Sequence, residues 1–246
     1  MSDFSGNIVA ITGAAQGLGA AMAARFLKDG AEGVALLDMN QNGLEATRKL
    51  LDPDGARTMT LICDVADSNS VAEAFEKINE RFGKIDILVN NAGITRDAMA
   101  QKMTVEQFDS VVKVSLYGSF NCAHQVIPGM RSRGYGRIIS LSSLASEGNI
   151  GQANYSAAKA GMIGMTKTLS LELGPKNITV NCVAPGMINT EMIKTVPSDV
   201  LDNFVNSIPL RRLGEPEEVA SLVAFLASDE AAYISGQCIT ISGGKR

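Results

Sequence analysis

The sequence predicts an α/β protein, one domain spanning residues 1–246, built on a doubly wound parallel sheet of seven strands with helices on both faces. Short apolar runs of strand length alternate with longer helix-forming segments along the whole chain. This alternation is typical of parallel strands joined by right-handed crossovers. No Pro/Gly/Ser-rich linker interrupts it, and an apolar content of 46% suffices for one sizeable core.

Each element follows from a local pattern. Apolar runs bounded by turn residues predict strands, and helix-forming runs between them predict helices. The region of about 187–214 lacks clean periodicity and contains two prolines, so we expect a long connection that serves as a substrate loop. The strands are expected at 7–12, 34–38, 58–63, 85–90, 136–142, 178–184 and 237–241, and the helices at 17–29, 43–51, 68–82, 104–131, 152–173 and 215–227.

Charge and composition exclude several classes of protein. A net charge of −4 and a pI near 5.1 argue against nucleic acid as a main partner. The first basic residue is Arg25, and no apolar span reaches the ~20 residues of a membrane helix, so we expect a cytoplasmic protein without a membrane partner. Four widely spaced cysteines without a metal-binding pattern predict no metal site and reduced, buried thiols: Cys63, Cys122, Cys182 and Cys238.

A glycine-rich turn follows the first predicted strand. The segment 12–19 has the spacing Gly-x3-Gly-x-Gly and stands directly before a helix. Glycines there permit a tight turn and close approach of a pyrophosphate, which the N–H groups and dipole of the helix favour. Asp38 ends the next apolar run nineteen residues after Gly19, where a carboxylate can hold a ribose hydroxyl. The turn is therefore expected to bind a dinucleotide.

Tyr155 and Lys159 are expected to carry chemistry. Their spacing of four places both side chains on one face of a helix, one turn apart. A cation there stabilises the phenolate, so the pKa of the tyrosine is expected to fall from about 10 towards neutrality. Such a tyrosine can give a proton to a carbonyl oxygen or take one from an alcohol.

Five motifs in this order resemble the short-chain dehydrogenases/reductases, a family with a Rossmann-type fold. The resemblance covers essentially the whole chain. Within the family, the strings at 91–97 and 151–155 look most like those of 3-oxoacyl-acyl-carrier-protein reductases. The motifs are the glycine turn at 12–19, Asn90-Asn91-Ala92-Gly93, a serine near position 142, Tyr155-x3-Lys159 and Pro185-Gly186.

The resemblance implies a role for each matched residue. Tyr155 would be the acid/base, Lys159 would tune it and bind the nicotinamide ribose, and Asp38 would hold the adenosine ribose. The remaining cofactor site would consist of Thr12, Gly13, Gln16, Gly17, Leu18 and Gly19 at the diphosphate, Asp64 and Val65 beside the adenine, Asn91, Ala92 and Gly93 at the adenine-side ribose and the end of the fourth strand, and Pro185, Gly186, Ile188 and Thr190 at the carboxamide end.

Two departures from the family pattern concern the catalytic group. The family usually has an asparagine in Val-Asn-Leu, where it supports a water-linked proton relay, and this chain has Ser115 there. The serine that orients the substrate oxygen is Ser143 if the strand is aligned, and Ser142 if residues are counted back from Tyr155. Successive strand residues face opposite sides of a sheet, so only one of them can face the site. We prefer Ser143, because a one-residue deletion is better tolerated in the following loop.

The cofactor is expected to be NAD(H). A carboxylate at Asp38 accepts hydrogen bonds from ribose hydroxyls and repels a 2′-phosphate. Relatives that use NADP usually place a basic residue near position 16 or 39, and this chain has Gln16 and Met39.

The predicted function is hydride transfer between NAD(H) and a carbonyl or secondary alcohol carbon, with a 3-oxoacyl thioester as the leading substrate. A hydroxysteroid or another secondary alcohol is the alternative. A non-catalytic NAD(H)-binding subunit or sensor is the alternative from another class. The resemblance implies a homotetramer, whereas Leu171 replaces an arginine common in acyl-carrier reductases and weakens an acyl-carrier protein as partner.

Overall fold

A parallel sheet of seven strands lies at the centre of the protein, in the order β3-β2-β1-β4-β5-β6-β7. The computed structural model describes residues 3–190 and 198–245, so part of the predicted substrate loop, 191–197, lies outside the described residues. The chain order reverses between β1 and β4, and ligands of such sheets bind at the carboxyl ends of the strands near this switch. The strands are β1 (Ile8–Thr12), β2 (Gly33–Asp38), β3 (Thr58–Ile62), β4 (Ile87–Asn90), β5 (Gly136–Leu141), β6 (Ile178–Pro185) and β7 (Cys238–Ile241).

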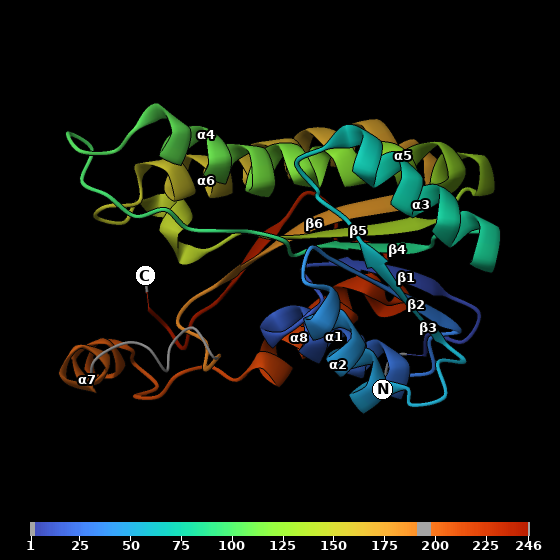
Figure 1. Cartoon of the computed structure of the whole chain (residues 1–246), viewed down its shortest axis with the longest axis horizontal. Helices are drawn as coiled ribbons and strands as arrows, with labels where there is room; N and C mark the ends of the chain where they lie inside the picture. The colour runs from blue at the N-terminus through green and yellow to red at the C-terminus, as the bar shows by residue number, and fades with distance from the viewer. Residues whose placement is uncertain (1–2, 191–197, 246) are drawn as a thin grey trace.

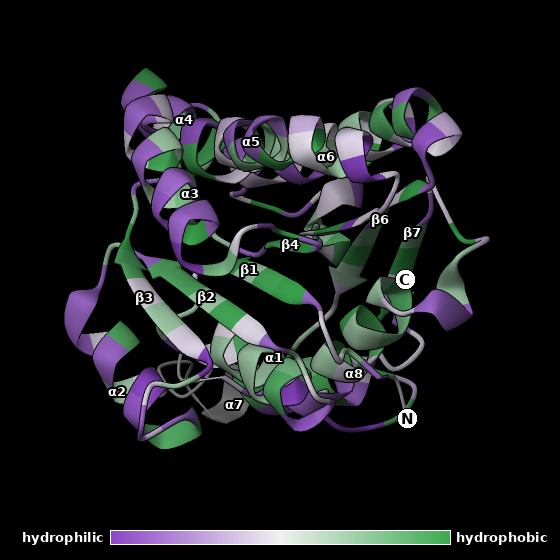
Figure 2. Cartoon of the chain, turned by 90° about the vertical axis from the view of Figure 1, so that its right-hand side faces the viewer, coloured by the Kyte–Doolittle hydropathy of each residue, from purple (hydrophilic) through white to green (hydrophobic). Residues whose placement is uncertain are grey.

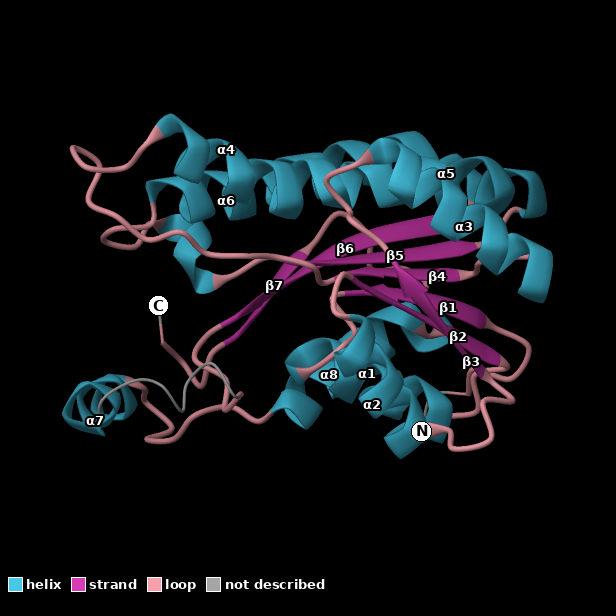
Figure 3. Ribbon diagram, in the orientation of Figure 1, coloured by secondary structure: helices cyan, strands magenta, loops and turns pink. Residues whose placement is uncertain are grey.

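Helices cover both faces of the sheet (Figure 1, and by element type in Figure 3). One layer holds α1, α2 and α8, and the other holds α3, α4, α5 and α6, while α7 stands apart from both layers. Their bounds are α1 (Gly17–Lys28), α2 (Gln41–Leu51), α3 (Ser68–Phe82), α4 (Val105–Val112), α5 (Gly118–Arg133), α6 (Ala153–Leu173), α7 (Ser198–Ser207) and α8 (Pro216–Ala227), with a π-helical turn η1 (Lys113–Tyr117) and 3-10 turns η2 (Leu144–Glu147), η3 (Gly174–Lys176) and η5 (Asp229–Ala231).

The core has two parts, one on each face of the sheet. Along β1, Val9 and Ile11 pack towards α1 and α8, whereas Ile8 and Ala10 pack towards α3 and α5. Both faces of β1 are therefore buried, which explains why it is a continuous apolar run rather than an alternation of apolar and polar residues. Figure 2 shows this hydrophobic layer of strands between the two helical layers.

A buried carboxylate, Asp86, joins three strands at the end of the sheet opposite the glycine turn. It is 3% exposed, and its Oδ2 accepts a hydrogen bond of 3.0 Å from the N–H of Ile8. Its carbonyl oxygen accepts the N–H of Arg137 at the start of β5. Lys84 and Arg133 pair with its carboxylate at 3.0 and 3.6 Å. The buried carboxylate is thus paired with two partly exposed cations and hydrogen-bonded, as burial of a charge requires.

The predicted fold class, its seven strands and most helices are confirmed. The helix expected at 104–131 is helical from 105 to 133, with a π turn between α4 and α5 that the sequence did not predict. A π turn adds one residue without ending the helix, so periodicity alone does not locate it. The loop expected at 187–214 contains α7, whose ten residues are too few for a clear helical period. Ile188 and Gly214 pair near the ends of this excursion.

Helix α5 begins at a glycine that has no room for a side chain. A Cβ at Gly118 would lie 2.6 Å from Cγ2 and 2.9 Å from Cβ of Val65, a side chain that cannot rotate away easily. We expect Gly118→Ala to lower the free energy of unfolding by about 1–3 kcal/mol, because the added methyl group overpacks the core. The higher helix propensity of alanine stabilises the helix by up to ~1 kcal/mol, which is too little to offset this loss.

Gly129→Ala in the same helix is the matched control. Its Cβ would meet only the flexible end of Arg133, at 3.1 Å from Nη1, so this substitution should be neutral or stabilising. Urea unfolding of both variants measures the difference. Equal midpoints would contradict the close packing of Gly118 on Val65.

Candidate active site

The turn between β1 and α1 leaves its backbone open to a ligand. Gly13 and Gly17 have φ of +65° and +56°, and a Cβ at Gly19 would lie 2.1 Å from the carbonyl oxygen of Gly13. No side chain caps the N-terminus of α1. Backbone N–H groups at this end are therefore available to a pyrophosphate, which the helix dipole also favours. This turn fits the diphosphate of a dinucleotide cofactor.

Asn91 connects the glycine turn to the end of β4 through hydrogen bonds. Its Nδ2 donates to the carbonyl oxygens of Thr12 and Gly13, both at 3.0 Å. In return, Oγ1 of Thr12 accepts the N–H groups of Asn91 at 3.0 Å and Ala92 at 3.1 Å. The amide of Asn91 thus stabilises the conformation of the glycine turn by bonding its carbonyl oxygens.

Asp38 lies beside the same turn, at the end of β2. Its Oδ2 accepts the N–H of Ala15 at 3.1 Å, and its Oδ1 accepts the N–H of Asn40 at 3.0 Å. These bonds hold the carboxylate in a fixed position next to the turn. The two positions where a cation would offset its charge carry Gln16 and Met39, both exposed and neither basic.

Tyr155 lies in the first turn of α6, next to Ser143. Burial raises the pKa of the Tyr155 hydroxyl above its ordinary value of 10, while a hydrogen bond with Ser143 acts to lower it and the charge of Asp97 to raise it. The expectation that a neighbouring cation lowers this pKa is wrong for the chain alone, because burial outweighs the favourable contacts. Tyr155 therefore carries its proton at neutral pH.

Lys159 lies one turn further along α6 and is 3% exposed. Its Nζ donates a hydrogen bond of 2.5 Å to the carbonyl oxygen of Leu141 and lies 5.4 Å from the centroid of the Tyr155 ring. Burial lowers the pKa of Lys159 to about 8. The amine thus faces the tyrosine ring and the end of β5, and it loses its charge more readily than an exposed lysine.

The two candidate serines point to different partners. Oγ of Ser142 donates to the carbonyl oxygen of Lys159 at 2.9 Å, and Ser142 is buried. Oγ of Ser143 accepts the N–H of Ala145 at 3.1 Å, and its interaction with the Tyr155 hydroxyl acts to lower the pKa of that hydroxyl. Ser142 thus anchors helix α6 to β5, whereas Ser143 faces the tyrosine hydroxyl.

Ser115 lies in the π turn η1 and is fully buried, and its Oγ has no hydrogen-bond partner among the residues that the structure describes. A Cβ at Gly93 would lie 3.4 Å from Oγ of Ser115 and 3.5 Å from Nζ of Lys159. Both polar atoms therefore border the same small space beside Gly93. Single π turns occur frequently at functional sites, since they redirect one side chain out of the regular helix.

The other predicted cofactor residues fall into two groups. Those at and after the end of β6 lie near two elements: Thr190 Cγ2 is 3.9 Å from a Cβ placed on Gly17 in the glycine turn, and the N–H of Gly186 donates to the carbonyl oxygen of Ile241 at the end of β7. Those after β3 are engaged locally: Asp64 accepts the N–H of Ala66 at 2.9 Å. The side chains of Val65, Pro185, Ile188 and Leu18 are buried or partly buried against the core.

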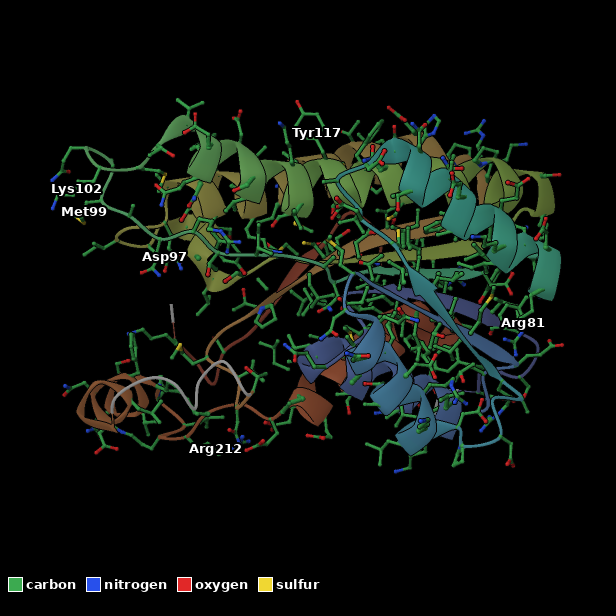
Figure 4. The ribbon with its side chains drawn as sticks, viewed as in Figure 1. Arg81, Asp97, Met99, Lys102, Tyr117 and Arg212 are labelled. Carbon is green, nitrogen blue, oxygen red and sulfur yellow. The ribbon has the colours of Figure 1, made fainter. Side chains whose placement is uncertain are left out.

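Asn154 is a positioning residue that the sequence did not single out. It is fully buried, and its Nδ2 donates to the carbonyl oxygens of Arg96 and Gln107 at 3.0 and 3.1 Å. Its Oδ1 accepts the N–H of Tyr155 at 2.8 Å. It thus joins the segment after β4 and helix α4 to the start of α6. Figure 4 shows this segment, labelled at Asp97, Met99 and Lys102, projecting beyond the sheet.

Comparison with known proteins decides the family. Residues 13–246 match the family model described as enoyl-(acyl carrier protein) reductase. The 3-oxoacyl-[acyl-carrier-protein] reductase FabG of Thermotoga maritima is 43% identical over 240 residues, 97% of each chain. The chain belongs to the short-chain dehydrogenase/reductase family. As a member of this family it is an oxidoreductase that binds a nicotinamide cofactor and acts on a carbonyl or alcohol carbon.

Two further short-chain dehydrogenase/reductase relatives are similar over nearly the whole chain. The acetoacetyl-CoA reductase of Cupriavidus necator is 43% identical over 241 residues, 96% of this chain and 97% of the relative. The crystal structure of levodione reductase superposes with a TM-score of 0.93 at 35% identity, covering 98% of both chains.

Among the described residues, no helix combines the length and apolarity that crossing a membrane requires.

The lock between Asn91 and the glycine turn can be tested with an isosteric change. Asn91→Asp replaces the donating amide by an oxygen, 3.0 Å from two carbonyl oxygens. We expect a loss of about 1–3 kcal/mol or more in the free energy of unfolding, together with weaker cofactor binding. Asn149→Asp is the control, since this exposed amide donates only to Gln152 and its loss should cost within ~0.5 kcal/mol. Equal effects on unfolding would contradict the supporting role of Asn91.

Proposed function

We propose that the protein reduces the keto group of a 3-oxoacyl thioester with NADH. The observation that carries this proposal is the cluster of Tyr155, Ser143 and Lys159 beside the glycine turn, on a chain 43% identical to FabG of Thermotoga maritima and to the acetoacetyl-CoA reductase of Cupriavidus necator. The protonated state of Tyr155 favours reduction, because the hydroxyl can donate its proton to a carbonyl oxygen.

Each residue of the cluster has a distinct task in this proposal. Ser143 hydrogen-bonds the substrate oxygen and orients it towards Tyr155, which donates the proton. Lys159 holds the cofactor ribose and supplies positive charge beneath the tyrosine. Ser115 takes the place of the family asparagine, and its hydroxyl passes a proton towards Lys159 through one water. The nicotinamide, when bound, supplies the hydride.

The cofactor residues support this arrangement. The glycine turn, from Thr12 to Gly19, would hold the diphosphate, with Asn91, Ala92 and Gly93 behind it. Asp38 would bind the adenosine ribose, and Asp64 with Val65 would flank the adenine. Pro185, Gly186, Ile188 and Thr190 would hold the carboxamide end, next to the substrate loop at 187–214.

Exposed apolar side chains on the two segments that precede α4 and α6 favour an acyl substrate. Met99 is 50% exposed and Ile150 is 87% exposed. Their segments are joined, because the N–H of Ala98 donates to the carbonyl of Gly151 at 2.8 Å and Gln152 Nε2 donates to Asp97 at 2.9 Å. An acyl chain could bury both side chains, which is favourable for the chain and the protein. Leu171, 80% exposed, replaces the arginine of acyl-carrier reductases, so we favour a CoA thioester over a carrier protein.

The experiment measures NADH consumption with acetoacetyl-CoA, steroid ketones and simple ketones. We expect the highest kcat/KM with acetoacetyl-CoA. Tyr155→Phe should lower turnover about 10²-fold or more and leave NADH binding nearly intact. Preference for a steroid or simple ketone would overturn the thioester substrate and favour the alternative of a secondary-alcohol dehydrogenase.

We also propose a homotetramer, as the family resemblance implies. Helices α4 and α5 and the π turn η1 between them expose large apolar side chains, with Phe108 at 38%, Tyr117 at 59% and Phe120 at 48%. Tyr117 lies on the outer side of the helical layer in Figure 4. Burial of such a face in a symmetric assembly removes apolar area from water. Cytoplasmic localisation stays a prediction.

The cofactor choice follows from Asp38. We expect a higher kcat/KM with NADH than with NADPH, because the fixed carboxylate repels a 2′-phosphate by several kcal/mol at an effective dielectric of about 20, before screening. Met39→Arg, next to Asp38, should lower the ratio of kcat/KM with NADH to kcat/KM with NADPH. Met99→Arg, away from the glycine turn, should leave this ratio unchanged. A wild-type preference for NADPH would refute the assignment.

The two serines should differ in their effect on turnover. Ser143→Ala removes the hydroxyl that contacts Tyr155, and we expect kcat to fall about 10²–10³-fold, the scale of one lost transition-state donor. Ser142→Ala removes a hydrogen bond to the backbone of α6, so it should mainly lower stability, by about 1–3 kcal/mol. Steady-state kinetics and urea unfolding of both variants separate the two effects. The reverse order would assign the catalytic hydroxyl to Ser142.

A further inference from the structure

Cys182 and Cys238 form a pair of thiols on the last two strands of the sheet. They are register partners in the parallel pairing of β6 with β7. Register partners carry their side chains on the same face, and neighbouring strands lie about 4.8 Å apart, within the ~4.4–6.8 Å between Cα atoms of disulfides. Strand β7 is the edge of the sheet and pairs only with β6 among the described strands. A bond between the two sulfurs therefore requires little movement of the backbone.

The two thiols have unequal surroundings. Cys182 is fully buried, and the hydrogen bond with Cys238 together with burial raises its pKa far above the ordinary value. Cys238 is partly exposed, and hydrogen bonding to Cys182 lowers its pKa, with a further contribution from Lys167. Cys238 is thus the accessible sulfur with more thiolate character, and Cys182 stands directly behind it. This arrangement suits an attacking and a resolving thiol.

We propose that Cys182 and Cys238 are a modification site at which a peroxide oxidises the two thiols to a disulfide within one chain. The Cys238 sulfur attacks a peroxide oxygen, so that an S–O bond forms, the O–O bond breaks and the leaving hydroxide takes up a proton. The Cys182 sulfur then displaces hydroxide from the Cys238 sulfenic acid, and its own proton leaves with that hydroxide as water. With hydrogen peroxide, two thiols give up two electrons and one disulfide and two waters result.

The other two cysteines provide an internal contrast. Cys63 and Cys122 are both buried, and burial raises the pKa of each above the ordinary range, to about 11 for Cys63. Neither combines exposure with a lowered pKa, so peroxide should leave both as thiols. The disulfide would join two strands that lead to the cofactor side of the fold. Ser242, after β7, has its Cα 3.0 Å from a Cβ placed on Gly186, after β6.

Peptide mapping of the purified full chain tests this site. The protein is treated with a small excess of hydrogen peroxide, blocked with N-ethylmaleimide in denaturant so that buried thiols react, and digested with trypsin. We expect peptides 177–194 and 213–245 to appear joined, two hydrogens lighter than their sum, and to separate after dithiothreitol. Cys63 and Cys122 should carry the maleimide. Alkylation of all four cysteines, a link between two chains, or a link between Cys63 and Cys122 would each overturn the proposal.

Variants separate the roles of the two sulfurs. In Cys182→Ser the attacking thiol has no partner, so dimedone should trap a sulfenic acid at Cys238, whereas Cys238→Ser should give no dimedone adduct at Cys182. The reverse labelling would contradict the assignment of the two roles. Oxidation should also raise the Tm of the wild-type protein, since the disulfide closes a long loop, and leave the Tm of Cys182→Ser unchanged. An oxidised wild type whose Tm equals that of the reduced protein would contradict a disulfide between these strands.

Discussion

The reciprocal hydrogen bonds between the end of β1 and the end of β4 are the constraint on which the site depends. Oγ1 of Thr12 accepts two backbone N–H groups from the β4 side, and the amide of Asn91 donates to two carbonyl oxygens on the β1 side. The β1 turn and the segment carrying Gly93 are thereby fixed to each other at the point where the strand order reverses. A pyrophosphate on one side and reacting groups on the other can then be held at a constant separation.

Burial of the Lys159 charge lowers the stability of the fold but strengthens its interaction with reacting groups. This burial lowers the pKa of Lys159 to about 8, and the carbonyl of Leu141 accepts the hydrogen bond that keeps it in place. Bound cofactor ribose hydroxyls would add acceptors. Active sites commonly maintain such unfavourable groups at a cost in stability, because the same low-dielectric surroundings strengthen interactions with a reacting charge.

Much of this architecture could be predicted from the sequence, because apolar runs and turn residues report directly on buried parallel strands. The glycine turn and the pair Tyr155 and Lys159 were located for the same reason, since their spacing carries the geometry. The π turn at Ser115 could not be predicted, because it shifts the helical phase by a single residue. The raised pKa of Tyr155 depends on burial by distant segments, and the pairing of Cys182 with Cys238 depends on strand register, neither of which local patterns contain.

Asp86 has a consequence for how the chain folds. Its bond to Ile8 spans 78 residues, and its ion pair with Arg133 reaches a third segment further along the chain. The ion pair with Arg133 lies within the half that begins with β4, but the bond to Ile8 cannot form until the β1–β2–β3 half has met that half. Loop closure over such distances must precede the stabilising contacts, which slows folding in proteins dominated by non-local pairing. We therefore expect docking of the two half-sheets, with this carboxylate leaving water, to be the late and rate-limiting event.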